Sequence, residues 1–118
     1  MADILVIDDD PSMRNLVSRI LIPAGHAVHQ AANGLAGLAA FHRIRPSLVI
    51  TDMIMPEAEG IETIRKLHGE APALPILAIS GSGSLYLESA AKLGATATIE
   101  KPFRPEELRS LVDRLLTR

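Results

Sequence analysis

The fold is decided by a stretch near the N-terminus, residues 4–21, which reads ILVIDDDPSMRNLVSRIL. Its first four residues are consecutively apolar, which is typical of a strand buried on both faces. After the three aspartates, Pro11 opens a segment whose apolar residues recur at spacings of three and four, the pattern of an amphipathic helix. Pro23 should end this helix early, near residue 22. The unit from which the chain is built is therefore one strand followed by one helix.

The same unit recurs along the rest of the chain. Further strands are expected at 27–31, with the polar alternation of an edge, and at 48–50, 76–79 and 95–99. Further helices are expected at 35–44, 61–67 and 85–93 and from Pro105 to the end, with Gly69 and Gly94 as C-caps. Such alternation forces parallel strands joined by right-handed crossovers. The predicted fold is α/β and doubly wound, a parallel sheet covered by helices on both faces.

The bulk composition limits the classes of function. A length of 118 residues fits one domain, residues 1–118, and a hydrophobic share of 47% fits a globular chain. A net charge of -2 with 3% aromatic residues argues against direct nucleic-acid binding. The absence of cysteine agrees with a reducing compartment, so a cytoplasmic location is expected. The first apolar run is too short for a signal peptide or a membrane span, so neither export nor membrane insertion is expected.

Polar residues follow each buried strand at the point where it ends. They are Asp8-Asp9-Asp10, Thr51-Asp52, Ser80 and Glu100-Lys101-Pro102. Taken singly, such residues are usually helix caps, turns or surface groups. The carboxyl ends of parallel strands meet at one edge, however, and that edge is where open α/β sheets bind ligands. Carboxylates gathered there would repel one another without a shared ligand, so a cation is expected.

Magnesium suits this predicted site best. Two or more carboxylates with open water positions match its octahedral oxygen coordination. The three negative charges of Asp8, Asp9 and Asp52 would be balanced by Mg²⁺ and Lys101. A phosphoryl group could then approach without meeting an uncompensated acidic pocket. The residues therefore favour phosphoryl chemistry.

With these residues identified, the sequence resembles the response-regulator receiver family, including its single-domain chemotaxis regulators, over essentially the whole chain. The matching motifs are Asp8-Asp9 after the first strand, Asp52-Met53-Ile54-Met55-Pro56 leading to Gly60, Ile79-Ser80, and Lys101-Pro102-Phe103. The resemblance implies a flavodoxin-like fold of five strand–helix units with strand order 2-1-3-4-5.

The resemblance also implies the chemical roles. Asp52 would be the phosphoacceptor, taking the group from a phosphohistidine on a sensor histidine kinase or a histidine phosphotransfer protein. Ser80 and Lys101 would contact the phosphoryl oxygens. The family often has a cis bond between the equivalents of Lys101 and Pro102, which would orient the lysine.

The metal ligands are implied in the same way. Asp9 and Asp52 would bind Mg²⁺ directly, Asp8 through a water molecule, and Ile54 through its backbone carbonyl. Because an apolar side chain at position 54 cannot orient water, slow autodephosphorylation is expected.

The expected output is a binding switch and not the turnover of a small molecule. Phosphorylation would draw Ser80 inward and change the surface formed by the fourth helix, fifth strand and fifth helix, which would bind a downstream protein or relay phosphate. Many family members have an aromatic switch residue three positions before the lysine, where this chain has Thr98. A monomer or a weak, phosphorylation-dependent dimer is expected.

Two other functions remain open at this point. In a haloacid-dehalogenase-like phosphatase, Asp8 would be the nucleophile and Asp10 the acid/base, but the chain lacks room for the usual cap and residues 52–56 would have no role. Alternatively, a receiver could signal without phosphorylation, through a fixed conformation or by dimerising. The sequence also leaves open a free-standing receiver or a fragment of a longer regulator.

Overall fold

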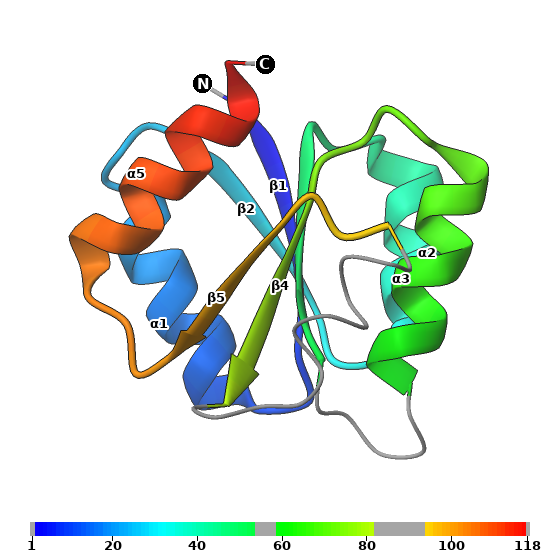
Figure 1. The fold of residues 1–118 in the computed structure, drawn as a ribbon, viewed down its shortest axis with the longest axis horizontal. Coiled ribbons are helices and arrows are strands. Elements are labelled where there is room, and N and C mark those ends of the chain that lie inside the picture. The colour runs from blue at the N-terminus through cyan, green and yellow to red at the C-terminus, as the bar shows by residue number, and fades with distance from the viewer. Residues whose placement is uncertain (1, 54–58, 82–93, 118) are drawn as a thin grey trace.

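A computed structural model describes residues 2–53, 59–81 and 94–117 (Figure 1). The strands are β1 Asp3–Ile7, β2 Ala27–Ala31, β3 Leu48–Asp52, β4 Ile76–Gly81 and β5 Ala97–Lys101. The described helices are α1 Pro11–Leu21, α2 Gly34–Ile44, α3 Glu59–Glu70 and α5 Pro105–Leu116. The helix expected at 85–93 lies outside the described residues. No helix in the described ranges has both the length and the apolar content needed to cross a bilayer.

The five strands form one parallel sheet in the order β2-β1-β3-β4-β5. This confirms the predicted α/β fold, and β2 lies at an edge as its polar alternation indicated. The first helix also begins and ends as expected, because Pro11 is its first residue and its C-cap is Ile22, immediately before Pro23. All the strands run in the same direction, so their carboxyl ends share one edge of the sheet.

Alternate residues of each strand face opposite layers of helix. Ile4 and Val6 of β1 pack in one core with residues of α1 and α5, whereas Leu5 and Ile7 pack in the other with residues of α2 and α3. Figure 1 shows these two helix pairs on opposite sides of the sheet. Because both of its faces are closely packed, the sheet is a rigid platform for groups at its carboxyl edge.

Several element boundaries differ from those expected, among them those of α3 and β5. Gly69 does not cap α3, because the helix continues to Glu70 and the amide of Ala71 still donates to the carbonyl oxygen of Leu67 at 2.8 Å. A glycine in a helix costs only about 1 kcal/mol, which further hydrogen bonds offset. The last strand lies two residues later than expected, since its ladder with β4 extends to the pair Gly81 and Lys101.

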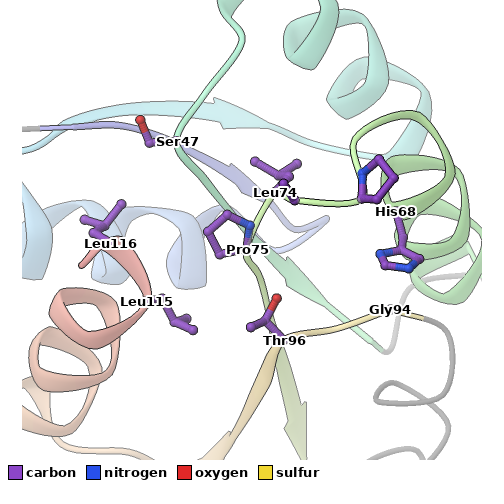
Figure 2. Close-up of a pocket in the computed structure, with 10 residues that line it drawn as sticks. Ser47, His68, Leu74, Pro75, Gly94, Thr96, Leu115 and Leu116 are labelled. Carbon is purple, nitrogen blue, oxygen red and sulfur yellow. The ribbon is translucent and has the colours of Figure 1, made fainter. Parts of the chain in front are cut away.

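A hollow of about 600 Å³ opens at the amino-terminal edge of the sheet. Figure 2 shows Pro75 in its centre, with Leu115 and Leu116 of α5 on one side and His68 of α3 on the other. Pro75 immediately precedes β4, so this hollow and the acidic residues lie at opposite ends of the strands. The acidic side chains at the carboxyl edge are therefore not part of this hollow.

Candidate functional site

Three carboxylates meet at the carboxyl ends of β1 and β3. Asp8 and Asp9 follow β1, and Asp52 is the last residue of β3. These strands are neighbours with Ile7 opposite Thr51, so Asp8 and Asp52 lie at the same level of the sheet. One oxygen from each of the three carboxylates lies within 4.8 Å of the others. The sheet register thus brings together the acidic residues that the sequence singled out.

Asp8 is the most constrained of the three residues. It is only 1% exposed, and its Oδ1 accepts a hydrogen bond from the amide of Asp10 at 2.9 Å. Its Oδ2 is buried and has no hydrogen-bond partner among the residues that the structure describes. Burial raises the pKa of Asp8 to about 6, and the negative charge of Asp52 adds to the rise, while the Asp10 amide and Lys101 oppose it. A buried carboxylate oxygen without a donor is unfavourable unless a cation compensates it.

The donor set at this edge fits a divalent cation such as Mg²⁺. Carboxylate oxygens are the hard ligands that Mg²⁺ prefers, and an octahedral ion needs only a few of them because water fills its other positions. Asp9 is exposed and Asp52 is 3% exposed, so the cluster joins a buried side to a solvent-facing side. Ile54, whose carbonyl was expected to be a further ligand, lies outside the described residues.

Lys101 lies beside the acidic cluster. Its Nζ is 3.2 Å from Oδ2 of Asp52, with side-chain exposures of 31% for the lysine and 4% for the aspartate. The lysine reaches this position from the end of β5, and its peptide bond to Pro102 is cis, as the resemblance implied. The positively charged ammonium group of Lys101 is therefore in contact with the carboxylate of Asp52.

Ser80 and Thr98 lie on the two strands beyond β3. Ser80 is fully buried near the end of β4, one residue past the pair formed by Asp52 and Ile79, and its Oγ donates to the carbonyl oxygen of Gly81 at 3.4 Å. Thr98 is half-buried on β5 opposite Ala78, so it lies two residues further from the carboxyl edge than Ser80. Ser80 thus lies beside the acidic cluster on the neighbouring strand, whereas Thr98 lies further from the carboxyl edge.

Backbone packing also shapes the site. Gly60, in the first turn of α3, is buried against the end of β3, and a Cβ there would overlap the carbonyl oxygens of Asp52 and Met53. Asp10, by contrast, caps α1 by accepting a hydrogen bond from the amide of Ser12 at 2.9 Å. The third aspartate of the run is therefore used to begin a helix.

Sequence reasoning missed Arg14. Its Nη1 donates a hydrogen bond of 2.7 Å to the carbonyl oxygen of Asp8, and its Nε donates one of 3.1 Å to Oε1 of Gln30. The available signal was its place on the helix, one turn before Ser18 at the polar border of the apolar stripe. That signal does not reveal the partner, which depends on how α1 lies on the sheet.

Comparison with known proteins gives a consistent result. A family model described as the response regulator receiver domain matches residues 4–113. The chain is 32% identical over 114 residues to sporulation initiation phosphotransferase F of Bacillus subtilis, covering 96% of this chain and 92% of that protein. It is 37% identical over 117 residues to response regulator MprA of Mycobacterium tuberculosis, covering 98% of this chain and 50% of that protein.

Solved structures agree with these sequence matches. The receiver domain of NtrX from Brucella abortus is 35% identical with a TM-score of 0.93, over 98% of each chain. Vibrio cholerae CheY4 is 34% identical with a TM-score of 0.90, over 98% of this chain and 99% of that one. The chain spans half or less of several curated relatives, with 50% of the regulator TcrX of Mycobacterium tuberculosis and 26% of NtrX of Azorhizobium caulinodans. The match and the capping role of Asp10 leave the phosphatase hypothesis without support.

Proposed function

Because this chain belongs to the response-regulator receiver family of two-component systems, we propose that it is a phosphoacceptor that carries its phosphoryl group on Asp52 with the help of Mg²⁺. Receiver domains are signalling domains. The observation that carries the proposal is the cluster of Asp8, Asp9 and Asp52, with Lys101 in contact with it. One buried oxygen of Asp8 lacks a hydrogen-bond donor in the part of the chain that the structure describes.

Within this proposal, Asp9 and Asp52 would hold Mg²⁺ directly, Asp8 would hold it through water, and the carbonyl of Ile54 would complete the protein ligands. The bound ion would supply positive charge that offsets the carboxylates and the incoming phosphoryl group. Asp8 and Asp52 are 1% and 3% exposed while Asp9 is open to solvent, which supports a site that holds an ion on a buried side and leaves positions for water on the other.

The phosphoryl step needs little covalent chemistry from the protein. A carboxylate oxygen of Asp52 forms a bond to phosphorus while the phosphorus–nitrogen bond of the donor phosphohistidine breaks. The leaving imidazole nitrogen keeps the electron pair and takes a proton from solvent. Lys101, 3.2 Å from Oδ2 of Asp52, stabilises the added negative charge, and the hydroxyl of Ser80 donates to a phosphoryl oxygen.

The output of the phosphorylated state is a change of binding surface. Ser80 moves towards the new phosphoryl oxygens, and this movement changes the surface made by the fourth helix, β5 and α5. Thr98 occupies the place of the usual aromatic switch residue and lines a hollow of about 430 Å³ with Glu107 and Arg114 of α5. A downstream protein or a phosphate-relay partner binds the surface made by the fourth helix, β5 and α5. The chain itself makes no direct contact with nucleic acid.

The remaining parts of the proposal concern the molecule as a whole. Residues 1–118 form one receiver domain, as a monomer or a weak dimer that depends on phosphorylation. It works in the cytoplasm, in agreement with the absence of cysteine. Its phosphoryl donor is a sensor histidine kinase or a histidine phosphotransfer protein. Its catalysis is limited to its own phosphotransfer and autodephosphorylation, and the latter is slow because Ile54 cannot orient water.

The test is incubation with Mg²⁺ and acetyl phosphate, followed by intact mass. The wild type and the control Asp113→Asn, altered at an exposed aspartate of α5, should each gain one phosphoryl group that requires Mg²⁺. Asp52→Asn should gain none, and Asp8→Asn should gain it slowly, with recovery at higher Mg²⁺. An adduct that persists in Asp52→Asn but disappears in Asp8→Asn would instead support the phosphatase, and no adduct in the wild type would favour signalling without phosphorylation.

A further inference from the structure

The guanidinium of Arg14 reaches from α1 to the backbone of the acidic segment. It donates at 2.7 Å to the carbonyl oxygen of Asp8 and at 3.1 Å to the side-chain oxygen of Gln30 on β2. The two bonds come from different nitrogens of one rigid, planar group, so they fix its orientation as well as its position. Arg14 therefore joins the edge strand of the sheet to the backbone beside the carboxylates.

Gln30 is itself held in one orientation. Its Nε2 donates to Oγ of Ser18 at 3.0 Å and to Oδ1 of Asn15 at 3.4 Å, which directs its oxygen towards Arg14. The Oγ of Ser18 in turn donates to the backbone oxygen of Arg14 at 2.9 Å. Each hydroxyl and amide group thus has a donor or acceptor role consistent with its neighbours, and the network sets the rotamer of Arg14.

The consequence for Asp8 is that most of its polar groups are occupied within the protein. Its amide donates to the carbonyl oxygen of Ala31 at 3.0 Å, its carbonyl accepts from Arg14, and its Oδ1 accepts from the amide of Asp10. Within the described ranges of the chain, Oδ2 has no such partner. The anchored carbonyl belongs to the peptide that links Asp8 to Asp9, so its orientation sets the directions of both side chains.

The choice of a carbonyl as the partner of Arg14 matters electrostatically. A guanidinium paired with the carboxylates would satisfy them and compete with a metal ion for the same oxygens. Bonded instead to the peptide oxygen at 2.7 Å, it holds the segment in place without occupying the carboxylate of Asp8, whose Oδ1 is paired with a neutral amide.

We propose that Arg14 is a positioning residue for the metal site, which fixes the Asp8–Asp9 peptide so that both carboxylates face Asp52, and that Gln30 holds Arg14 in that role. This inference rests on the proposed function, because it assumes that the cluster binds Mg²⁺. It assigns the edge strand β2, which carries none of the acidic residues, a part in the geometry of the site.

The test is a Mg²⁺ titration of the full chain, in which binding is monitored through the chemical shifts of the backbone amides. Arg14→Met should bind Mg²⁺ about 10- to 100-fold more weakly, the usual effect of losing a group that orients a metal ligand. Arg14→Lys should fall between, because an ammonium can reach a carbonyl but cannot bridge rigidly to Gln30. Arg19→Met, at an exposed arginine of the same helix, should bind like the wild type.

Phosphorylation by acetyl phosphate provides an independent readout. In Arg14→Met the Mg²⁺ concentration for half-maximal rate should rise in parallel with the dissociation constant, while the rate at saturating Mg²⁺ stays within about twofold of wild type. A lower rate at saturating Mg²⁺ with an unchanged half-saturation point would overturn the positioning role.

Gln30→Ala tests the network without touching the acidic segment, and its exposed site makes it tolerant of change. It should weaken Mg²⁺ binding severalfold in the wild type and have no effect in the Arg14→Met background, because the two residues act through one contact. If Arg14→Met does not fold, the loss of affinity in Gln30→Ala carries the test alone.

The outcomes separate the two proposals. A wild-type protein that does not bind Mg²⁺ would refute the proposed function. A wild type that binds Mg²⁺ while Arg14→Met, or Gln30→Ala in its place, binds equally well would overturn the positioning role and leave the proposed function intact. If Arg14→Met or Gln30→Ala unfolds at a lower urea concentration in EDTA but keeps its Mg²⁺ affinity, the positioning role is likewise overturned and the proposed function is left intact.

Discussion

Replacing Asp8 with asparagine should make the metal-free protein more stable at pH 8. Asp8 is 1% exposed, its Oδ2 has no donor, and burial is the main reason that its pKa is raised from 3.8 to about 6. A rise of that size means that the ionised carboxylate is disfavoured in the folded state by about 3 kcal/mol. Asparagine removes the charge and keeps an oxygen that can accept from the amide of Asp10. Its NH₂ group needs a partner, so the expected net gain is about 1–3 kcal/mol.

The gain should depend on pH in a defined direction. Between pH 3.8 and about 6 the folded protein holds a proton on Asp8 that the unfolded chain has released. The contribution of Asp8 to the free energy of unfolding of the wild type therefore falls as the pH rises through this window and is flat above it. The asparagine variant lacks this loss. Its advantage should be near zero at pH 4 and should reach its full size above pH 6.5.

Urea unfolding followed by circular dichroism, in EDTA at pH 4, 5, 6 and 8, measures this directly. With a typical urea dependence of about 1–3 kcal/mol per molar, the midpoint at pH 8 should rise by roughly 1 M. Asp9→Asn is the matched control, since this exposed neighbour in the same cluster should change stability by under about 1 kcal/mol. Saturating Mg²⁺ should stabilise the wild type more than Asp8→Asn and so narrow or reverse their difference.

Three results would refute this reasoning. The first is an Asp8→Asn variant that is no more stable than wild type at pH 8 in EDTA. The second is a gain of equal size at pH 4 and pH 8, which would mean that packing and not ionisation is responsible. The third is an equal gain in Asp9→Asn, which would mean that the burial of Asp8 is irrelevant.

Other expected outcomes follow from single contacts. Lys101→Met should slow phosphorylation by acetyl phosphate at least about 10-fold, measured by intact mass, because its ammonium lies 3.2 Å from Asp52; an unchanged rate would remove it from the site. Gly60→Ala should cost about 1–3 kcal/mol in urea unfolding, since its Cβ would overlap the backbone at Asp52. Gly69→Ala, with nothing within 4 Å of its Cβ, should instead gain about 0.5–1 kcal/mol. Ile54→Asn should shorten the phosphoryl half-life, and an unchanged half-life would contradict slow dephosphorylation.

The fold was largely predictable because local signals and burial agreed. The edge strand β2 was predicted with its observed bounds, and Pro23 ended the first helix where expected. The errors occurred where backbone hydrogen bonds outweighed the preferences of single residues. Gly69 looked like a helix end, yet the amide of Ala71 keeps the helical hydrogen-bond pattern. The last strand was expected to end at residue 99, before Glu100 and Lys101, but β5 is an edge strand and its ladder with β4 includes both residues.

The acidic part of the site was predictable for a topological reason. In a parallel sheet, the residues that end neighbouring strands share one edge, so Asp8 and Asp52 had to lie close together once both strands were identified. The contact between Arg14 and the carbonyl of Asp8 could not be found in this way, because it depends on the crossing of α1 over the sheet and on the rotamer of Gln30. Periodicity identifies the face of a helix but not the reach of a polar side chain at its border.

The packing of the sheet also constrains how a phosphoryl group on Asp52 could be transmitted. The strands are closely packed on both faces, so added charge at their carboxyl edge cannot be absorbed by movement of the core. It must be met by groups that can move at that edge, and Lys101 and Ser80 lie on the two strands nearest to the end of β3 on that side. Thr98, two residues further from the edge, is too short to fill the place of an aromatic ring. Within the proposed function, we therefore expect the signal to pass through Ser80 more than through the side chain at position 98.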